Sequence, residues 1–228
     1  MTAPDSSRSD RPLVDTRDMV LVHTAMLREF RLAPAAVRRV AEADSRQAGV
    51  VADHLRFLGE LLHHHHQGED DLLWPKLRAR TGSDALLVIE AVEAQHEDID
   101  ATLRDVEQLR SAWAAHPVAG LRERLAAALE RLHLVLRDHL DLEERALLPL
   151  AAAVLTDEEW HAVGEAGAAS IPTPTMPLVL GMFAYEGDRA VLATMLSSAP
   201  LPVRVLIPRI GSLVYARRAR RVHGRRRP

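Results

Sequence analysis

Residues 65–75 read HHQGEDDLLWP, and residues 139–149 read HLDLEERALLP. In each stretch the first histidine is followed four residues later by a glutamate, and a proline follows that glutamate by six residues. Residues four apart lie on one face of an α-helix, one turn from each other. Each stretch therefore predicts a helix that points an imidazole and a carboxylate to the same side.

A further histidine precedes each stretch at a matched distance. His23 lies 42 residues before His65, and His96 lies 43 residues before His139. The two halves of the chain therefore repeat each other, and each half supplies two helices with inward histidines. The repeat predicts one buried cluster of candidate metal ligands, which are His23, His65, Glu69, His96, His139 and Glu143.

Apolar residues recur at helical spacing around these histidines. The pattern predicts four long helices, over residues 15–34, 45–80, 84–115 and 121–155, with Pro34 ending or kinking the first. The chain is 47% hydrophobic but only 4% aromatic, and its many Ala and Leu residues also favour helices. We therefore expect an all-α fold, built as an up-down-up-down four-helix bundle.

The chain divides into three regions. Residues 1–14 are polar and are expected to form a disordered leader, and residues 15–155 form the bundle. Residues 156–228 are expected to form a Pro-rich, partly helical C-terminal extension. At its start, Thr156 and Glu159 have the spacing of a capping box, which predicts a short helix.

The chain has no cysteine, which excludes a disulfide framework, thiolate metal ligands and a cysteine nucleophile. Its N-terminal sequence, MTAPDSSRSDRPL, lacks the apolar segment of a secretory signal. No apolar run reaches the roughly 18 residues of a membrane-spanning helix. We therefore expect a cytoplasmic protein.

The predicted cluster has the chemistry of a two-metal site. Carboxylates bridge paired hard cations, and imidazole suits iron. Four imidazoles and two carboxylates would leave about two positions on each six-coordinate ion for solvent, oxygen or peroxide. Without a metal, these buried polar groups would need other partners in a core of Leu and Ala. A ferritin-type carboxylate bundle would use Glu-x-x-His pairs, so the His-x-x-x-Glu spacing disfavours it.

With the Leu-Trp-Pro and Leu-Leu-Pro sequences that follow its glutamates, the doubled motif resembles the hemerythrin HHE cation-binding domain. The resemblance covers roughly residues 15–155 and implies two iron ions in a non-haem centre inside the bundle, although the same ligands accept manganese or zinc. Oxygen-carrying hemerythrins have a fifth histidine where this chain has Asp100. Their second bridge is an aspartate five residues after its histidine, whereas Glu143 follows its histidine by four. The chain therefore resembles the HHE branch used in sensing and redox roles.

Other polar residues near the motif have plainer interpretations. A single inward histidine is usually a core residue with hydrogen-bond partners. His64 and His66 are expected beside the cluster or exposed, with the alternative that either is an extra ligand or a donor to a ligand. Asp100 stays open as a seventh ligand or a proton carrier, and His54 is expected to be a core or capping residue.

Three functions fit such a centre. The first is redox chemistry on oxygen or peroxide, with catalase- or peroxidase-like turnover. The second is a binding module without turnover, which senses oxygen, nitric oxide or iron, or stores iron. The third is a structural metal, which the open coordination positions disfavour. Because no fused signalling domain is recognisable, we favour the first.

Charge is unevenly spread along the chain. The net charge is −3, but ten arginines and no acidic residue occur from residue 189 onward, so the first 188 residues carry −13. Solvated charge is the first interpretation of the basic tail, residues 217–227, and contact with an anionic membrane surface or with nucleic acid stays open. No base-reading module is recognisable. We therefore expect a small-molecule partner (oxygen, peroxide or nitric oxide) and no sequence-specific nucleic acid.

Overall fold

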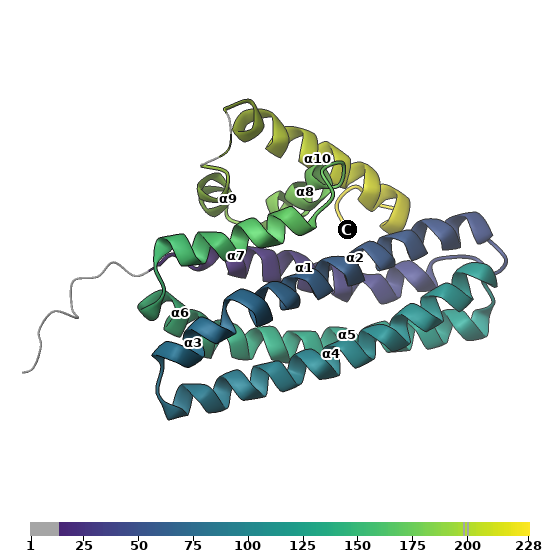
Figure 1. Ribbon diagram of the computed structural model, residues 1–228. Helices are drawn as coiled ribbons and strands as arrows, with labels where there is room; N and C mark the ends of the chain where they lie inside the picture. Colours follow the sequence, from purple (N-terminus) through teal and green to yellow (C-terminus); the bar gives the residue numbers. More distant parts are fainter. Residues whose placement is uncertain (1–13, 198, 200) are drawn as a thin grey trace, which may run out of the picture.

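The structure is a computed structural model that describes residues 14–197, 199 and 201–228. Within this part of the chain, helices are joined by short turns and there is no strand (Figure 1). The elements are α1 (Arg17–Arg38), α2 (Ser45–Leu72), α3 (Trp74–Arg80), α4 (Ser83–Ala115), α5 (Ala119–Leu142), the π-helical η2 (Glu143–Leu147), α6 (Leu148–Val154), α7 (Asp157–Ser170), α8 (Met176–Glu186), α9 (Arg189–Met195) and α10 (Leu201–His223). The all-α prediction is confirmed. The predicted leader lies outside the described residues except for Val14.

Four of these helices, α1, α2, α4 and α5, form the bundle (Figure 1). Short turns join α1 to α2 and α4 to α5, so the helices of each pair run antiparallel. Around the bundle, α1 contacts α5, α5 contacts α4, α4 contacts α2, and α2 contacts α1. This closed order is that of the predicted up-down-up-down bundle. Helices α7 to α10 form a further layer that lies against α1 and α2.

Two apolar clusters fill the interior. The larger one extends from the bundle into the C-terminal helices, and the smaller one lies near α3 and α6. On α2, Leu62 belongs to the larger cluster and Leu73, directly after the helix, to the smaller, while His66 and Glu69 are buried between them. The same order holds on α4 and α5, so a polar layer divides the core of the bundle.

Both motif helices change their hydrogen bonding shortly after the glutamate. Helix α2 stops one residue before α3, and Pro75 lies in the first turn of α3. The fourth helix passes through the π-helical turn η2, in which the N–H of Leu148 donates to the carbonyl of Glu143, and Pro149 lies in the first turn of α6. Proline has no N–H to donate, so it suits a first helical turn. The matched prolines therefore explain why both helices, predicted as continuous, are interrupted.

The first helix does not end at Pro34. Helix α1 continues to Arg38 and buries Ala36 and Val37 in its last turn. Burying apolar surface contributes about 25 cal/mol per Å², which offsets the single backbone hydrogen bond that the proline lacks.

The C-terminal extension is packed against the bundle. Helix α7 begins with the predicted capping box, because the Thr156 hydroxyl accepts from the N–H of Glu159 and the Glu159 carboxylate accepts from the N–H of Thr156. This prediction is confirmed. Helices α8 and α10 cross at Gly181 and Gly211, where a Cβ on Gly181 would collide with the carbonyl group of Gly211. Only glycine lets two backbones approach so closely.

The basic tail forms the end of α10. Ala219 and Val222 are buried, and Nη2 of Arg39 donates to the carbonyl oxygen of Val222 at 2.8 Å. Arg217 and Arg220 are exposed, so solvated charge describes only one side of the tail. Its contact with an anionic membrane stays a prediction. None of the helices in the described part of the chain is both long and apolar enough to cross a membrane.

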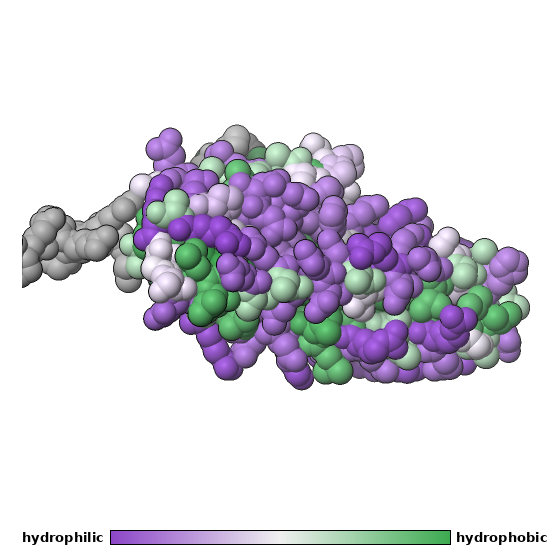
Figure 2. Space-filling model, turned by 60° about the horizontal axis from the view of Figure 1, so that its bottom comes forward, coloured by the Kyte–Doolittle hydropathy of each residue, from purple (hydrophilic) through white to green (hydrophobic). Residues whose placement is uncertain are grey.

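The face formed by α3, α4 and α5 is mostly hydrophilic (Figure 2). The large apolar side chains exposed on α4 and α5, such as Leu87 and Leu134, are few. Scattered apolar side chains of this kind are ordinary on protein surfaces. The features that suggest a function therefore lie inside the bundle and under the extension.

A buried ionic network joins α10 to the bundle at Glu29 of α1. Oε1 of Glu29 accepts hydrogen bonds from Arg28 at 2.9 and 3.1 Å and from the Tyr215 hydroxyl at 2.7 Å. Oε2 lies 3.1 Å from Nε2 of His54 and 3.6 Å from Nε2 of His223. His54 is thus the core residue that the sequence predicts, and the network fixes the end of α10 to α1 and α2.

We predict that Glu29→Gln lowers the free energy of unfolding by about 3–5 kcal/mol, because it removes the carboxylate that Arg28, Tyr215 and His54 share in a buried network. Urea unfolding followed by circular dichroism measures this loss. Glu123→Gln is the matched control, since Glu123 pairs with Arg38 at the surface and its loss should leave the midpoint almost unchanged. Equal effects of both variants would contradict the structural role of the network.

The pH dependence of the same variant has a defined sign. Burial raises the pKa of Glu29, but hydrogen bonds from His223 and His54 and the charge of Arg28 outweigh it, so the pKa lies well below its usual value. Such a carboxylate stabilises the fold fully above its unfolded pKa, about 4.3, and loses that contribution as the pH falls through the folded value. The stability difference between wild type and Glu29→Gln should therefore shrink below about pH 4.3, and a constant difference down to acid unfolding would contradict this.

Candidate metal centre

The motif on α2 places two neighbouring histidines in the polar layer. Nε2 of His65 lies 3.1 Å from Oε1 of Glu69, as the spacing of four residues predicts. His66 is also turned inward and is only 3% exposed, whereas the sequence favoured a position beside the cluster or at the surface and left an extra ligand as the alternative. The structure supports the alternative, because successive helical residues point only about 100° apart and the polar layer accepts both side chains.

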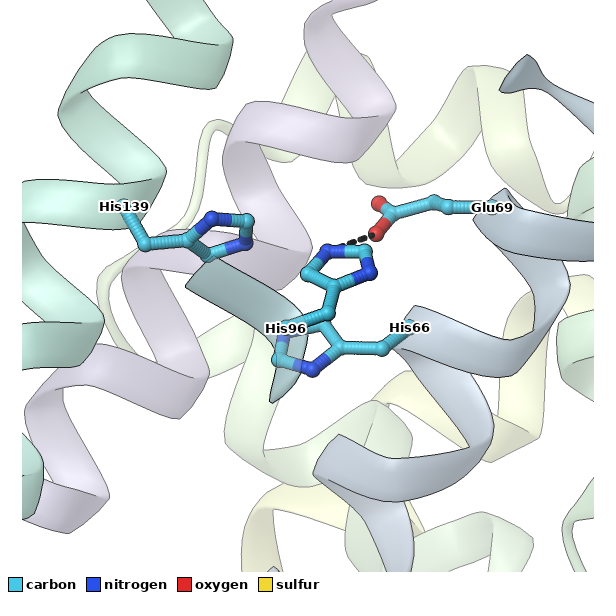
Figure 3. Close-up of side chains that lie close together, drawn as sticks. All are labelled: His66, Glu69, His96 and His139. Atoms are coloured by element: carbon cyan, nitrogen blue, oxygen red, sulfur yellow. Dashed lines mark ion pairs between the residues drawn. The ribbon is translucent and has the colours of Figure 1, made fainter. Parts of the chain in front are cut away.

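Helices α4 and α5 supply His96 and His139. The ring of His66 stacks on that of His96 with centroids 4.1 Å apart, and both rings meet His139 edge-on at 5.0 and 4.8 Å. Nε2 of His96 lies 3.6 Å from Oε2 of Glu69. Figure 3 shows these four side chains converging from three helices, and one ligand atom from each lies within 4.8 Å of the others.

Helix α1 and the turn η2 complete the layer. Nε2 of His23 lies 3.0 Å from Nε2 of His65 and 3.7 Å from Oε2 of Glu143. The same Glu143 oxygen lies 3.7 Å from Nε2 of His139. The structure therefore brings together all six residues that the sequence predicts as ligands, and it adds His66.

Acidic side chains lie at Nδ1 of two histidines and fix the orientation of their rings. Nδ1 of His96 lies 2.9 Å from Oδ1 of Asp70, and Nδ1 of His23 lies 2.9 Å from Oε1 of Glu144. A carboxylate in this position accepts a hydrogen bond from Nδ1–H, which leaves Nε2 unprotonated and directed into the layer. Gln95 Oε1 lies 3.3 Å from Nδ1 of His139 and can do the same.

Asp70, Glu144 and Gln95 are absent from the set predicted from the sequence. The first two carry a readable signal, because an acidic residue directly follows the motif glutamate in both repeats. Gln95 occurs once and has no counterpart, so only the structure reveals it.

Several buried polar groups of the layer lack hydrogen-bond partners among the described residues. Glu69 and Glu143 are fully buried, and within the described part of the chain none of their carboxylate oxygens has a hydrogen-bond partner. Burial and the charge of Glu143 raise the pKa of Glu69 well above its usual value, and burial also raises the pKa of Glu143. Burial lowers the pKa of His65 and of His66 well below the usual value, and it lowers the pKa of His139 to about 3.

These properties fit a pair of bound cations. Imidazole must be neutral to bind a metal, and the lowered pKa values keep these rings neutral. Among the described residues, Nε2 of His96, Nε2 of His139 and both ring nitrogens of His66 also lack hydrogen-bond partners. Each buried polar atom without a partner costs about 1–3 kcal/mol. Cations between the carboxylates would offset these costs, and the mixture of imidazole and carboxylate donors suits iron, manganese or zinc.

The two remaining candidates lie outside the layer. Oδ1 of Asp100 lies 3.8 Å from Nδ1 of the exposed His63, and His64 is exposed. Neither belongs to a group of described residues that converges closely enough to hold an ion. The structure therefore gives no support to Asp100 or His64 as a metal ligand.

A third convergent group is the network of Glu29, His54 and His223. Arg28 already binds the Glu29 carboxylate, and Nε of Arg218 donates to Nδ1 of His54 at 3.5 Å. One guanidinium group on the carboxylate and a second beside His54 repel a further cation, so we interpret this group as an ionic network and not as a metal site.

Comparison with known proteins agrees with the geometry. The model of a family described as the hemerythrin HHE cation binding domain matches residues 14–151. No curated protein and no solved structure matches the chain. The matched range includes all seven side chains of the polar layer and ends shortly before α7.

We predict that His65→Ala, His66→Ala and Glu69→Ala each lower the metal content of the purified protein, because each removes a donor that no neighbour replaces. Metal analysis of protein loaded under identical conditions measures the loss. His64→Ala is the matched control, since it removes an exposed histidine from the same run. Full metal content in all variants would rule out the polar layer as the site.

The residues that bind Nδ1 of the histidines should change the affinity for the metal without being required for metal binding. We predict that Asp70→Asn and Glu144→Gln weaken metal binding about 10–100-fold, which is typical when an orienting partner is lost. Competition with a chelator of known affinity measures the change. Asp71→Asn, an exposed neighbour on α2, should bind metal like the wild type, and equal affinity in all three variants would contradict the orienting role.

Proposed function

Because the chain belongs to the hemerythrin HHE cation-binding family, we propose that its polar layer holds two iron ions and reacts with oxygen or peroxide. The observation that carries the proposal is a set of buried donor atoms that have no hydrogen-bond partner among the described residues, which are Nε2 of His96 and His139 and the carboxylate oxygens of Glu69 and Glu143. A purely structural site would close its coordination, whereas this donor set leaves positions open.

The seven side chains divide unequally between two positions. One convergent group contains His66, His96 and His139, the other contains His23 and His65, and Glu69 belongs to both groups. Glu143 also lies between histidines of the two groups. With both carboxylates shared, a six-coordinate ion beside three histidines would have about one open position, and an ion beside two histidines about two. The side of His23 and His65 is thus the more open one.

Iron is the proposed metal because imidazole and carboxylate together suit it, and manganese and zinc accept the same donors. Two bound iron ions would supply electrons to oxygen or peroxide in single steps. The protein's part is to hold the ligands and to keep the centre dry. Glu69 lies under the apolar clusters with no exposed surface, and burial of its carboxyl group makes it a group that can hold a proton at Oε1 or Oε2 until a cation displaces it.

A binding module without turnover is the alternative, in which oxygen, nitric oxide or iron is sensed or iron is stored. It is favoured by the contact of α7 to α10 with α1 and α2, the helices that carry His23 and His65. A change at the centre would reach the extension through these helices. Peroxide turnover separates the two functions, since only the first requires it.

We predict that protein loaded with ferrous iron without oxygen holds about two ions per chain, gains a near-ultraviolet absorption band on exposure to oxygen or peroxide, and consumes peroxide. His65→Ala should lower this turnover to that of metal-free protein, while His64→Ala retains it. Spectral change on binding oxygen or nitric oxide, with no peroxide consumed, would favour the binding module. No spectral change at all would overturn both.

A further inference from the structure

An apolar pocket of about 460 Å³ lies between the bundle and the C-terminal extension. Met19, Val22 and Met26 of α1 form part of its wall, and Leu61 of α2 continues it. Helices α7, α8 and α9 supply the opposite side, for example through Phe183 of α8. The pocket therefore exists only because the extension packs against α1 and α2.

The pocket reaches the metal centre. Its lining includes His65 and Glu69 from the polar layer and the exposed His64 beside them. His66, His96 and His139 are not part of the lining. The pocket thus meets the centre on the side of His65, where the proposed donor set leaves more positions open.

The size and polarity of the pocket indicate the chemistry of an occupant. Oxygen and peroxide are of about the size of a water molecule, which takes up about 30 Å³, whereas sites for organic molecules measure about 300–1,000 Å³. The ionisable side chains of the lining are acidic or histidine, and among the described residues it contains neither Lys nor Arg. Asp15 is paired with Arg17, but Asp18 and Asp157 add negative charge to a lining that offers a carboxylate no Lys or Arg among the described residues, so the lining favours a neutral molecule over a fatty acid.

We propose that this pocket binds a neutral, apolar organic molecule, such as a medium-chain alcohol, with its polar end at the partly exposed His65. Its apolar part contacts the side chains of α1, α7 and α8, and burial of that part supplies most of the affinity. The inference rests on the proposed function only for what happens at the metal. Binding itself depends on the pocket alone.

Two glycines allow the pocket to be filled without disturbing its walls. Gly68 on α2 and Gly167 on α7 line the pocket from opposite sides, and a Cβ on either would meet no atom within 4 Å. Gly167 lies on the same face of α7 as the buried Val163. Gly49 on α2 is equally unobstructed but lies outside the pocket, so Gly49→Leu is a matched control. Each substitution replaces glycine in a helix with a better helix former.

The experiment titrates full-length, iron-loaded protein with the neutral fluorescent probe N-phenyl-1-naphthylamine. The probe is then displaced with decanol or decanoate from metal-free protein, in which no bound cation attracts the carboxylate. We expect saturable binding, displacement by decanol at lower concentration than by decanoate, and at least about tenfold weaker binding in Gly68→Leu and Gly167→Leu, as overfilling of a packed site predicts. Gly49→Leu should bind like the wild type.

Three results would overturn the inference. They are no saturable binding, equal binding by Gly167→Leu, Gly68→Leu and wild type, and displacement by decanoate as readily as by decanol. Peroxide assays on the same samples distinguish failure of the pocket inference from failure of the proposed redox function. Probe binding without turnover supports the pocket and contradicts the redox function, and turnover without probe binding does the reverse.

Discussion

The constraint on which the structure depends is a layer of polar side chains inside an apolar bundle. Burying two carboxylates costs several kcal/mol for each charge unless opposite charge is close by. In the described part of the chain no Lys or Arg binds Glu69 or Glu143, whereas the equally buried Glu29 is bound by Arg28. Arginine thus compensates one buried carboxylate, and the two in the polar layer have the surroundings expected of metal ligands.

The same local arrangement of residues builds the polar layer in both halves of the bundle. In each half, a histidine and a glutamate four residues apart enter the polar layer, and the acidic residue directly after the glutamate binds a histidine of another helix. A proline six residues after the glutamate lies where the regular helical hydrogen bonding is interrupted. The two halves are not fully symmetric. The second half contains the π-helical turn at Glu143, and the first half supplies two inward histidines in place of one. This asymmetry makes one side of the centre richer in nitrogen donors than the other.

Much of this arrangement is predictable from sequence because helical periodicity fixes which side chains share a face. The spacing of His65 and Glu69, and of His139 and Glu143, therefore predicts their common depth. For His66 the sequence leaves two interpretations open, because a stripe 100° away is buried or exposed according to the width of the polar layer. The pocket under α7 is not predictable from the sequence, because it depends on how an extension with weak helical patterning packs. The sequence also does not predict that α1 continues past Pro34, because burial of apolar side chains in the tertiary structure outweighs the helix-breaking effect of the proline.

The most direct test of the account is a crystal structure of the metal-loaded protein with anomalous diffraction recorded at the absorption edge of the bound metal. Two anomalous peaks, about 3.5–4 Å apart, should lie between Glu69 and Glu143, one beside His23 and His65 and the other beside His66, His96 and His139. A single peak in the layer, or peaks only at other acidic or histidine groups such as that of Glu29, would contradict the two-metal centre.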